Sequence, residues 1–115
     1  MSRRAERVAE AVREELADMQ LRDLKDPRIG MVTLTTVQVS DDLRHAKIYF
    51  SCVGDEATQQ RSLNGLRSAA GFIRRQLMRR LQLRHAPELV FVFDTALAGA
   101  EHLSNLLRTA RGTDE

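Results

Sequence analysis

Arginine is the residue type of this chain whose spacing most clearly suggests a chemistry. Between Glu56 and Glu88 the sequence contains seven arginines and neither aspartate nor glutamate, although the 115 residues carry a formal net charge of only +2. A guanidinium group stays charged and can hydrogen-bond two phosphate oxygens at once, so arginines without acidic neighbours suit a nucleic-acid backbone. The opposing interpretation is a solvated helix face that carboxylates from other segments neutralise after folding. The strongest candidates for phosphate contact are Arg74, Arg75, Arg79, Arg80 and Arg84.

Basic residues elsewhere would extend this surface if the fold brings them alongside. These additional candidates for RNA contact are Arg3, Arg4, Arg44 and Lys47. Arginines four positions apart on a helix, such as Arg75 and Arg79, lie roughly 6 Å from each other, close to the phosphate spacing of one strand. The four phenylalanines occupy expected core positions, so exposed aromatic platforms for single-stranded bases are scarce. This combination favours recognition of structured RNA through its shape and phosphates.

Side chains that could perform catalysis are few. The sequence has no glycine-rich phosphate loop of the GxxxxGK[ST] or GxGxxG type, and its serines have no GxSxG context. Carboxylates that could hold a metal are Asp41, Asp42 and Asp94, but the first two fit a turn and the third fits a strand end. The histidines lack metal-ligand spacing. We therefore expect no enzyme, metal, cofactor or small-molecule substrate; a small nuclease with a metal on these aspartates is an alternative.

Length and composition indicate a single domain over residues 1–115, with a frayed tail at about 108–115. No apolar run approaches the length of about 18 residues that a membrane span needs, and the first residues lack an apolar signal core. We therefore expect a cytoplasmic protein without membrane contact. Cys52 is the one cysteine, which excludes an internal disulfide, and we expect it to be a buried, inert thiol. No apolar seam demands a dimer, so we expect a monomer.

The elements that must position these residues can be read from the periodicity of apolar residues. Residues 3–24 have helical spacing, and Asp26-Pro27 ends that helix. Residues 31–39 and 46–53 are predicted strands that form an antiparallel hairpin through a turn at 40–43. Residues 88–94 are apolar on both faces, which predicts a strand that is covered on both sides.

The segment between the hairpin and the last strand is predicted to form two helices. The first begins near Glu56, and the second runs over residues 72–83, before Pro87. Ala69, Ala70 and Gly71 interrupt the pattern between them, which favours a kink where small side chains let two helices approach; a helix end capped by Gly71 is the alternative. A leucine at Gly71 should then overpack this contact.

Leucines at 103, 106 and 107 predict a short C-terminal helix. The predicted fold is therefore α+β, with three strands that carry the helices on one face.

Five stretches of the sequence resemble the bacterial ribosome-binding factor A family, in the right order between residues 7 and 107. The stretches are 7–10 (RVAE), 24–30 (LKDPRIG), 39–49 (VSDDLRHAKIY), 69–74 (AAGFIR) and 83–94 (LRHAPELVFVFD). The resemblance implies a KH-like fold of the type II order, α-β-β-α-kink-α-β. KH domains proper clamp single-stranded RNA with a GxxG loop between two helices. The proteins that this chain resembles have an Ala-x-Gly kink there, which falls on Ala69, Ala70 and Gly71.

The resemblance also implies a function. Members of the family are understood to bind the small ribosomal subunit and to act late in its assembly, including maturation of 16S ribosomal RNA. They also matter for growth in the cold. Two departures are His85-Ala86, where bulkier or hydroxylated residues are common, and a short tail after Leu107. We therefore predict a non-enzymatic assembly factor that docks on the RNA of the immature small subunit. An adaptor that binds an acidic protein through the arginine-rich helix is the alternative.

Overall fold

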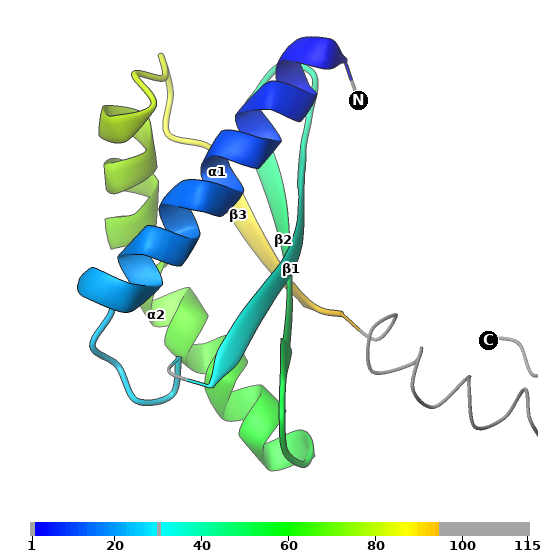
Figure 1. Ribbon diagram of the computed structural model, residues 1–115, viewed down its shortest axis with the longest axis vertical. Helices are drawn as coiled ribbons and strands as arrows, with labels where there is room; N and C mark the ends of the chain where they lie inside the picture. Colours follow the sequence, from blue (N-terminus) through cyan, green and yellow to red (C-terminus); the bar gives the residue numbers. More distant parts are fainter. Residues whose placement is uncertain (1, 30, 95–115) are drawn as a thin grey trace, which may run out of the picture.

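Two helices cover one face of a three-stranded sheet (Figure 1). This computed structural model describes residues 2–29 and 31–94. The elements follow the order α1 (Arg3–Arg22), β1 (Val32–Val39), β2 (His45–Cys52), α2 (Glu56–Arg80) and β3 (Glu88–Phe93). The predicted α+β class, with its helices on one face of the sheet, is confirmed. The short C-terminal helix and the frayed tail that the sequence predicts lie outside the described residues.

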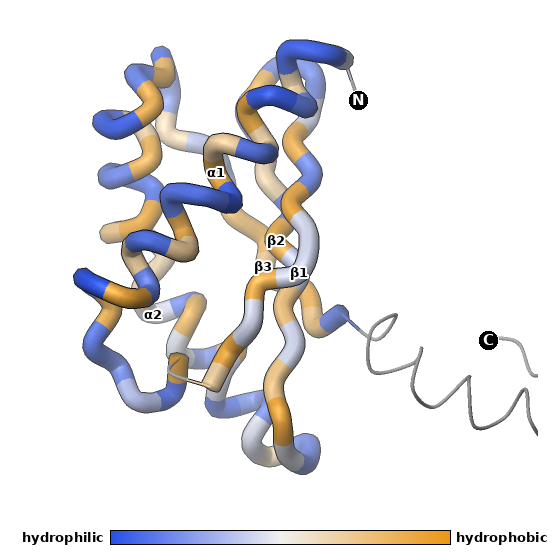
Figure 2. The backbone as a smooth tube through the Cα atoms, viewed as in Figure 1, coloured by the Kyte–Doolittle hydropathy of each residue, from blue (hydrophilic) through white to orange (hydrophobic). Residues whose placement is uncertain are grey.

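Helix α1 forms because a capping residue precedes an apolar stripe. Ser2 Oγ accepts a hydrogen bond from the backbone N–H of Ala5 at 3.1 Å, which satisfies one of the free amides of the first turn. Buried residues then recur every three or four positions: Ala5, Ala9, Val12, Leu16 and Met19. Figure 2 shows the resulting alternation of hydrophilic and hydrophobic residues along the helices. This stripe holds α1 against the sheet.

The sheet has the order β1-β2-β3, with β2 in the middle. Strands β1 and β2 pair antiparallel, as predicted for the hairpin, and an irregularity between Leu34 and Thr36 shifts their register. Strand β3 pairs parallel to β2, so α2 is the crossover that connects them. Ala46, Ile48 and Phe50 of β2 are buried, whereas Cys52 is only partly buried, in contrast to the expected buried thiol.

Strand β3 is less covered than its sequence suggested. Val90 is 50% exposed, although the apolar residues on both faces of the strand predicted cover on both sides. The prediction was wrong because both helices lie on the same face of the sheet, while β3 is an edge strand. Phe91, which points to the helices, is buried.

The two helices predicted after the hairpin are one continuous helix, α2, which ends at Arg80 rather than at residue 83. Figure 1 shows that its yellow-green C-terminal part runs in a different direction from its green N-terminal part. Helix α2 therefore bends but remains continuous. Ala69 and Ala70 are partly buried against the core, whereas Gly71 is exposed.

The close approach expected at Gly71 occurs instead at Gly65. A Cβ atom at Gly65 would lie 3.0 Å from Arg28 Cβ and 3.2 Å from Ile29 Cγ1. At Gly71 the nearest atom would be Nη1 of the flexible Arg75 side chain, at 3.4 Å. The helix contact that a leucine at Gly71 was expected to overpack is therefore not found among the described residues, because Gly71 is exposed and only the flexible Arg75 side chain lies near it. Small residues in a helix do not by themselves reveal which of them meets another backbone.

Candidate nucleic-acid interface

An exposed pair of arginines lies on the outer side of α2. Arg75 and Arg79 are exposed, whereas Ile73 and Leu77 on the opposite side of the helix are completely buried. Neither guanidinium group forms a hydrogen bond or an ion pair with the part of the chain that the structure describes. The two guanidinium groups are therefore available to an anionic partner, as the sequence predicted.

Arg80 has a different environment, because three carboxylates of α1 and the loop after it surround its guanidinium group. Nη1 lies 3.0 Å from Glu15 Oε1 and 3.0 Å from Asp18 Oδ2, and Nη2 lies 2.9 Å from Asp23 Oδ2. The hydrogen bond to Glu15 is the main cause that raises the pKa of Arg80 above its ordinary value. Only 26% of the side chain is exposed. Arg80 thus links α2 to α1 and is not a free phosphate contact, in contrast to the prediction.

Arg74 is also used within the protein. Its Nε donates to the carbonyl of Pro87 at 2.8 Å, its Nη2 donates to the carbonyl of Ala86 at 3.3 Å, and Nη2 lies 3.2 Å from Glu88 Oε2. These contacts hold the segment that leads into β3. Arg74 is therefore a positioning residue for this segment rather than an open anion contact.

The remaining basic candidates are distributed over two regions. Arg4, Arg44 and Arg84 line one groove of about 720 Å³ between the start of α1, the β1–β2 turn and the segment after α2. Arg3 is exposed in the first turn of α1 but does not line the groove. Lys47 is exposed on β2, on the face of the sheet opposite Ala46 and Ile48, and so lies away from the helices.

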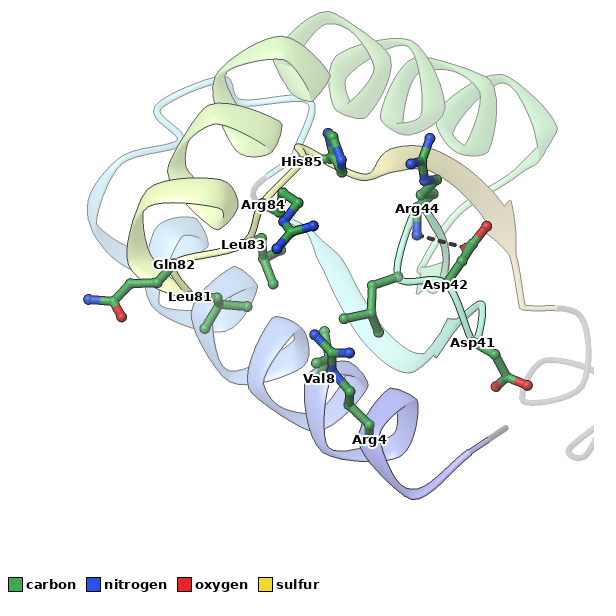
Figure 3. A pocket seen from close by; sticks show the side chains of 11 residues that line it. Arg4, Val8, Asp41, Asp42, Arg44, Leu81, Gln82, Leu83, Arg84 and His85 are labelled. Atoms are coloured by element: carbon green, nitrogen blue, oxygen red, sulfur yellow. Dashed lines mark hydrogen bonds between the residues drawn. The ribbon is translucent and has the colours of Figure 1, made fainter.

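Figure 3 shows how the groove is built. Arg4 and Arg84 extend toward one another across it, while the guanidinium group of Arg44 lies at the rim and points away from the centre. Val8 and Leu83 are beside the two converging arginines. The groove therefore combines positive charge with an apolar wall.

Two residues that the sequence analysis missed shape this groove. Leu43 and Gln82 both line it, and both have left-handed backbone conformations, with φ of 63° and 52°. Gln82 follows the C-cap of α2, where its N–H donates to Arg79 O at 3.4 Å and the N–H of Leu83 donates to Met78 O at 2.9 Å. This is the helix-ending arrangement that usually contains glycine. Because glutamine occupies the position, the sequence carries no signal for it.

The aspartates considered for metal binding do not form one site. Asp42 accepts hydrogen bonds from Ser40 Oγ at 2.6 Å and from the N–H of Arg44 at 3.0 Å, and chiefly the first lowers its pKa. Asp41 accepts from the N–H of Ser2 at 2.8 Å. Asp94 follows β3 and accepts a hydrogen bond from Thr35 at the other end of the sheet.

Within residues 2–29 and 31–94, no three His, Cys, Asp or Glu side chains are grouped so that they could hold a metal ion. The nuclease alternative therefore has no support in this geometry.

Neither of the helices that the structure describes is both long and apolar enough to span a membrane.

Together, the element order and the bent second helix with its outward arginines define a small KH-like α+β protein. A family model described as Ribosome-binding factor A matches residues 4–107. The chain belongs to the ribosome-binding factor A family.

Named relatives support this assignment. Ribosome-binding factor A of Desulforamulus reducens is 49% identical over 107 residues, which cover 93% of this chain and 89% of the relative. The crystal structure of ribosome-binding factor A from Thermus thermophilus has a TM-score of 0.66 at 25% identity and covers 76% of this chain and 93% of that one. A homology model of the Thermus thermophilus protein was fitted into a cryo-EM map of its 30S complex. It has a TM-score of 0.58 at 25% identity and covers 84% of this chain and 97% of that one.

Proposed function

We propose that this protein binds the immature small ribosomal subunit and assists late maturation and processing of its 16S RNA, including at low temperature. The observation that carries the proposal is the outward pair Arg75 and Arg79, which has no carboxylate partner in the described residues. The family assignment supports the same partner, because the Thermus thermophilus relative was fitted into a 30S complex. With such a partner, we expect the protein to act in the cytoplasm.

The proposed mechanism is binding without catalysis. A factor that binds one conformation of ribosomal RNA more tightly than another shifts their populations by the difference in binding free energy. Cold deepens the traps of misfolded RNA, so this shift matters more at low temperature. One copy of the domain, acting as a monomer over residues 1–115, suffices for such a role.

We propose different roles for the predicted contact residues, some as RNA contacts and others as positioning residues. The proposed phosphate contacts are Arg75, Arg79, Arg84, Arg4, Arg44 and Arg3. Arg74 and Arg80 hold the segment after α2 and the α1–α2 contact in place. Lys47, on the other side of the sheet, would be reached only by a partner that wraps around the molecule.

A matched pair of double variants tests the proposal. Arg75→Gln/Arg79→Gln should weaken binding to purified immature small subunits by about tenfold or more, because each arginine loses a charge-assisted contact with phosphate. Arg13→Gln/Arg22→Gln is the control, since these exposed arginines already pair with Glu10 and Asp18. The control should change the affinity by less than about threefold. Cosedimentation at fixed salt measures both.

The outcomes separate the competing functions. Equal effects of the two double variants would place the contact surface elsewhere. Binding of the wild-type protein to subunit proteins after removal of the RNA would favour the adaptor that binds an acidic partner. Unchanged thermal unfolding of both variants shows that neither effect comes from loss of the fold.

A further inference from the structure

We propose that the groove between α1, the β1–β2 turn and the segment after α2 binds an unpaired nucleotide of RNA. Arg4 and Arg84 hold its phosphate, and the apolar wall receives its ribose and base. This inference rests on the proposed function only in that the ligand is RNA. It names a second contact region, separate from the outer side of α2 that carries Arg75 and Arg79.

The first argument is the convergence of like charges. Arg4 and Arg84 come from chain segments that are far apart in sequence, yet Figure 3 shows their side chains extending toward one another. Neither guanidinium group has a hydrogen bond or an ion pair with any residue that the structure describes. Two positive charges brought together without a carboxylate repel each other, and an anion between them relieves this repulsion.

The acidic residues of the groove do not form ion pairs with Arg4 or Arg84. The carboxylate of Asp42 is engaged by Ser40 Oγ and by the N–H of Arg44, and Asp41 is engaged by the N–H of Ser2. In Figure 3 Asp41 points away from Arg84. Both aspartates therefore organise the turn and the start of α1, while the opposite side of the groove remains positive.

The second argument is the size and character of the cavity. Its volume of about 720 Å³ lies within the range of roughly 300–1,000 Å³ that is usual for small-molecule and cofactor sites. Val8, Leu43 and Leu81 are partly buried and pack against the hydrophobic core, so the core supports this apolar wall from behind. A base that leaves an RNA stack needs such an apolar surface, whereas a bare phosphate does not.

The third argument is that the groove has a fixed backbone. Leu43 and Gln82 adopt left-handed conformations on its two sides, and side chains rarely adopt them without support from the surrounding structure. At Gln82 this support comes from the two hydrogen bonds that end α2, to Arg79 O and Met78 O. A preformed groove binds its ligand without the entropic penalty of ordering a loop.

Binding of a short unstructured oligouridylate to the full chain tests the phosphate contacts. Arg4→Gln/Arg84→Gln should raise the Kd by about tenfold, while the control Arg13→Gln/Arg22→Gln should raise it by less than about threefold. Fluorescence anisotropy measures both, and thermal unfolding confirms that the variants are folded. An effect of the groove variant no larger than that of the control overturns the proposal.

Methyl NMR tests the nucleotide itself. The methyl resonances of Val8, Leu81 and Leu83 should shift with oligouridylate, because a base placed beside them adds a ring current, and should not shift with inorganic polyphosphate of equal charge. Equal responses to both ligands, or no response to the RNA, overturn the proposal. Failure here, with subunit binding still sensitive to Arg75→Gln/Arg79→Gln, removes the groove alone and leaves the proposed function intact.

Discussion

Neighbouring arginines on one helix serve different purposes in this protein. Arg79 and Arg80 are adjacent in sequence, but Arg79 is exposed and unpaired within the described residues, whereas Arg80 meets three carboxylates. The helical rotation of about 100° per residue separates them, because it turns Arg80 toward α1. A count of arginines therefore overstates the proposed RNA-binding surface, and the position of each residue around the helix decides its role.

Removal of the Arg80 side chain should destabilise the fold. Arg80→Gln leaves Glu15, Asp18 and Asp23 close together without their common cation, and we expect the free energy of unfolding to fall by about 1–2 kcal/mol after allowance for solvent screening. Urea unfolding measures the change. Arg79→Gln is the matched control and should be neutral. Equal stability of the two variants would show that the ion pairs contribute nothing.

The same cluster predicts a pH dependence. Hydrogen bonds from Arg22, and to a lesser degree from Arg80, lower the pKa of Asp18 below its ordinary 3.8. A carboxyl group whose pKa is lower in the folded than in the unfolded protein stabilises the fold in full at a pH above its unfolded-state pKa. This stabilisation is lost as the pH falls through its folded-state pKa. The difference in the free energy of unfolding between the wild type and Arg80→Gln should therefore become smaller below about pH 4. A difference that is constant from pH 7 to pH 3 would contradict this account.

At the scale of elements, helix α2 determines most of the functional geometry. Its buried residues fix it on the sheet, its bend sets the direction of the C-terminal half, and its end places Arg84 in the groove. Gly65 permits the close contact with the loop before β1, whereas Gly71 lies on the exposed side near the bend. The two glycines of the helix therefore have opposite expected responses to substitution.

A pair of alanine substitutions tests this difference. Gly65→Ala should lower the free energy of unfolding by about 1–3 kcal/mol, because the new Cβ would lie 3.0 Å from Arg28 Cβ. Gly71→Ala should raise it by roughly 0.5–1 kcal/mol, because alanine favours the helix and only a flexible arginine is near. Chemical denaturation measures both values. A destabilising Gly71→Ala would show that the bend requires glycine.

Much of this element-level geometry could be predicted from the sequence. The periods of apolar residues indicated α1, the hairpin and the last strand, and Arg75 and Arg79 were among the predicted phosphate contacts. The contacts of Arg74 and Arg80 could not be predicted, because their partners come from other segments of the chain. Arg74 contacts Pro87 and Glu88, and Arg80 contacts Glu15 and Asp23. The groove was also missed, since Gln82 replaces the glycine that usually marks such a helix end.

At the scale of the whole molecule, the proposed RNA contacts lie on the helical side and at one end. Arg75 and Arg79 lie on the outer side of α2, and Arg4 and Arg84 lie in the groove beyond its C-terminus. The uncovered face of the sheet carries Lys47 and the half-exposed Val90. Arg4, Arg75, Arg79 and Arg84 thus give a near-neutral protein an anion-seeking surface on its helical side and at one end, and we expect this surface to orient the protein on RNA.

The salt dependence of subunit binding tests the central claim, namely that unpaired arginines contact RNA phosphates. With about five contacts, the slope of log K against log salt concentration should be roughly −3 to −5 for the wild type. Arg75→Gln/Arg79→Gln should make the slope shallower by about 1.5–2, and Arg13→Gln/Arg22→Gln should leave it unchanged. A wild-type slope near zero, or equal slopes for the wild type and Arg75→Gln/Arg79→Gln, would contradict the account.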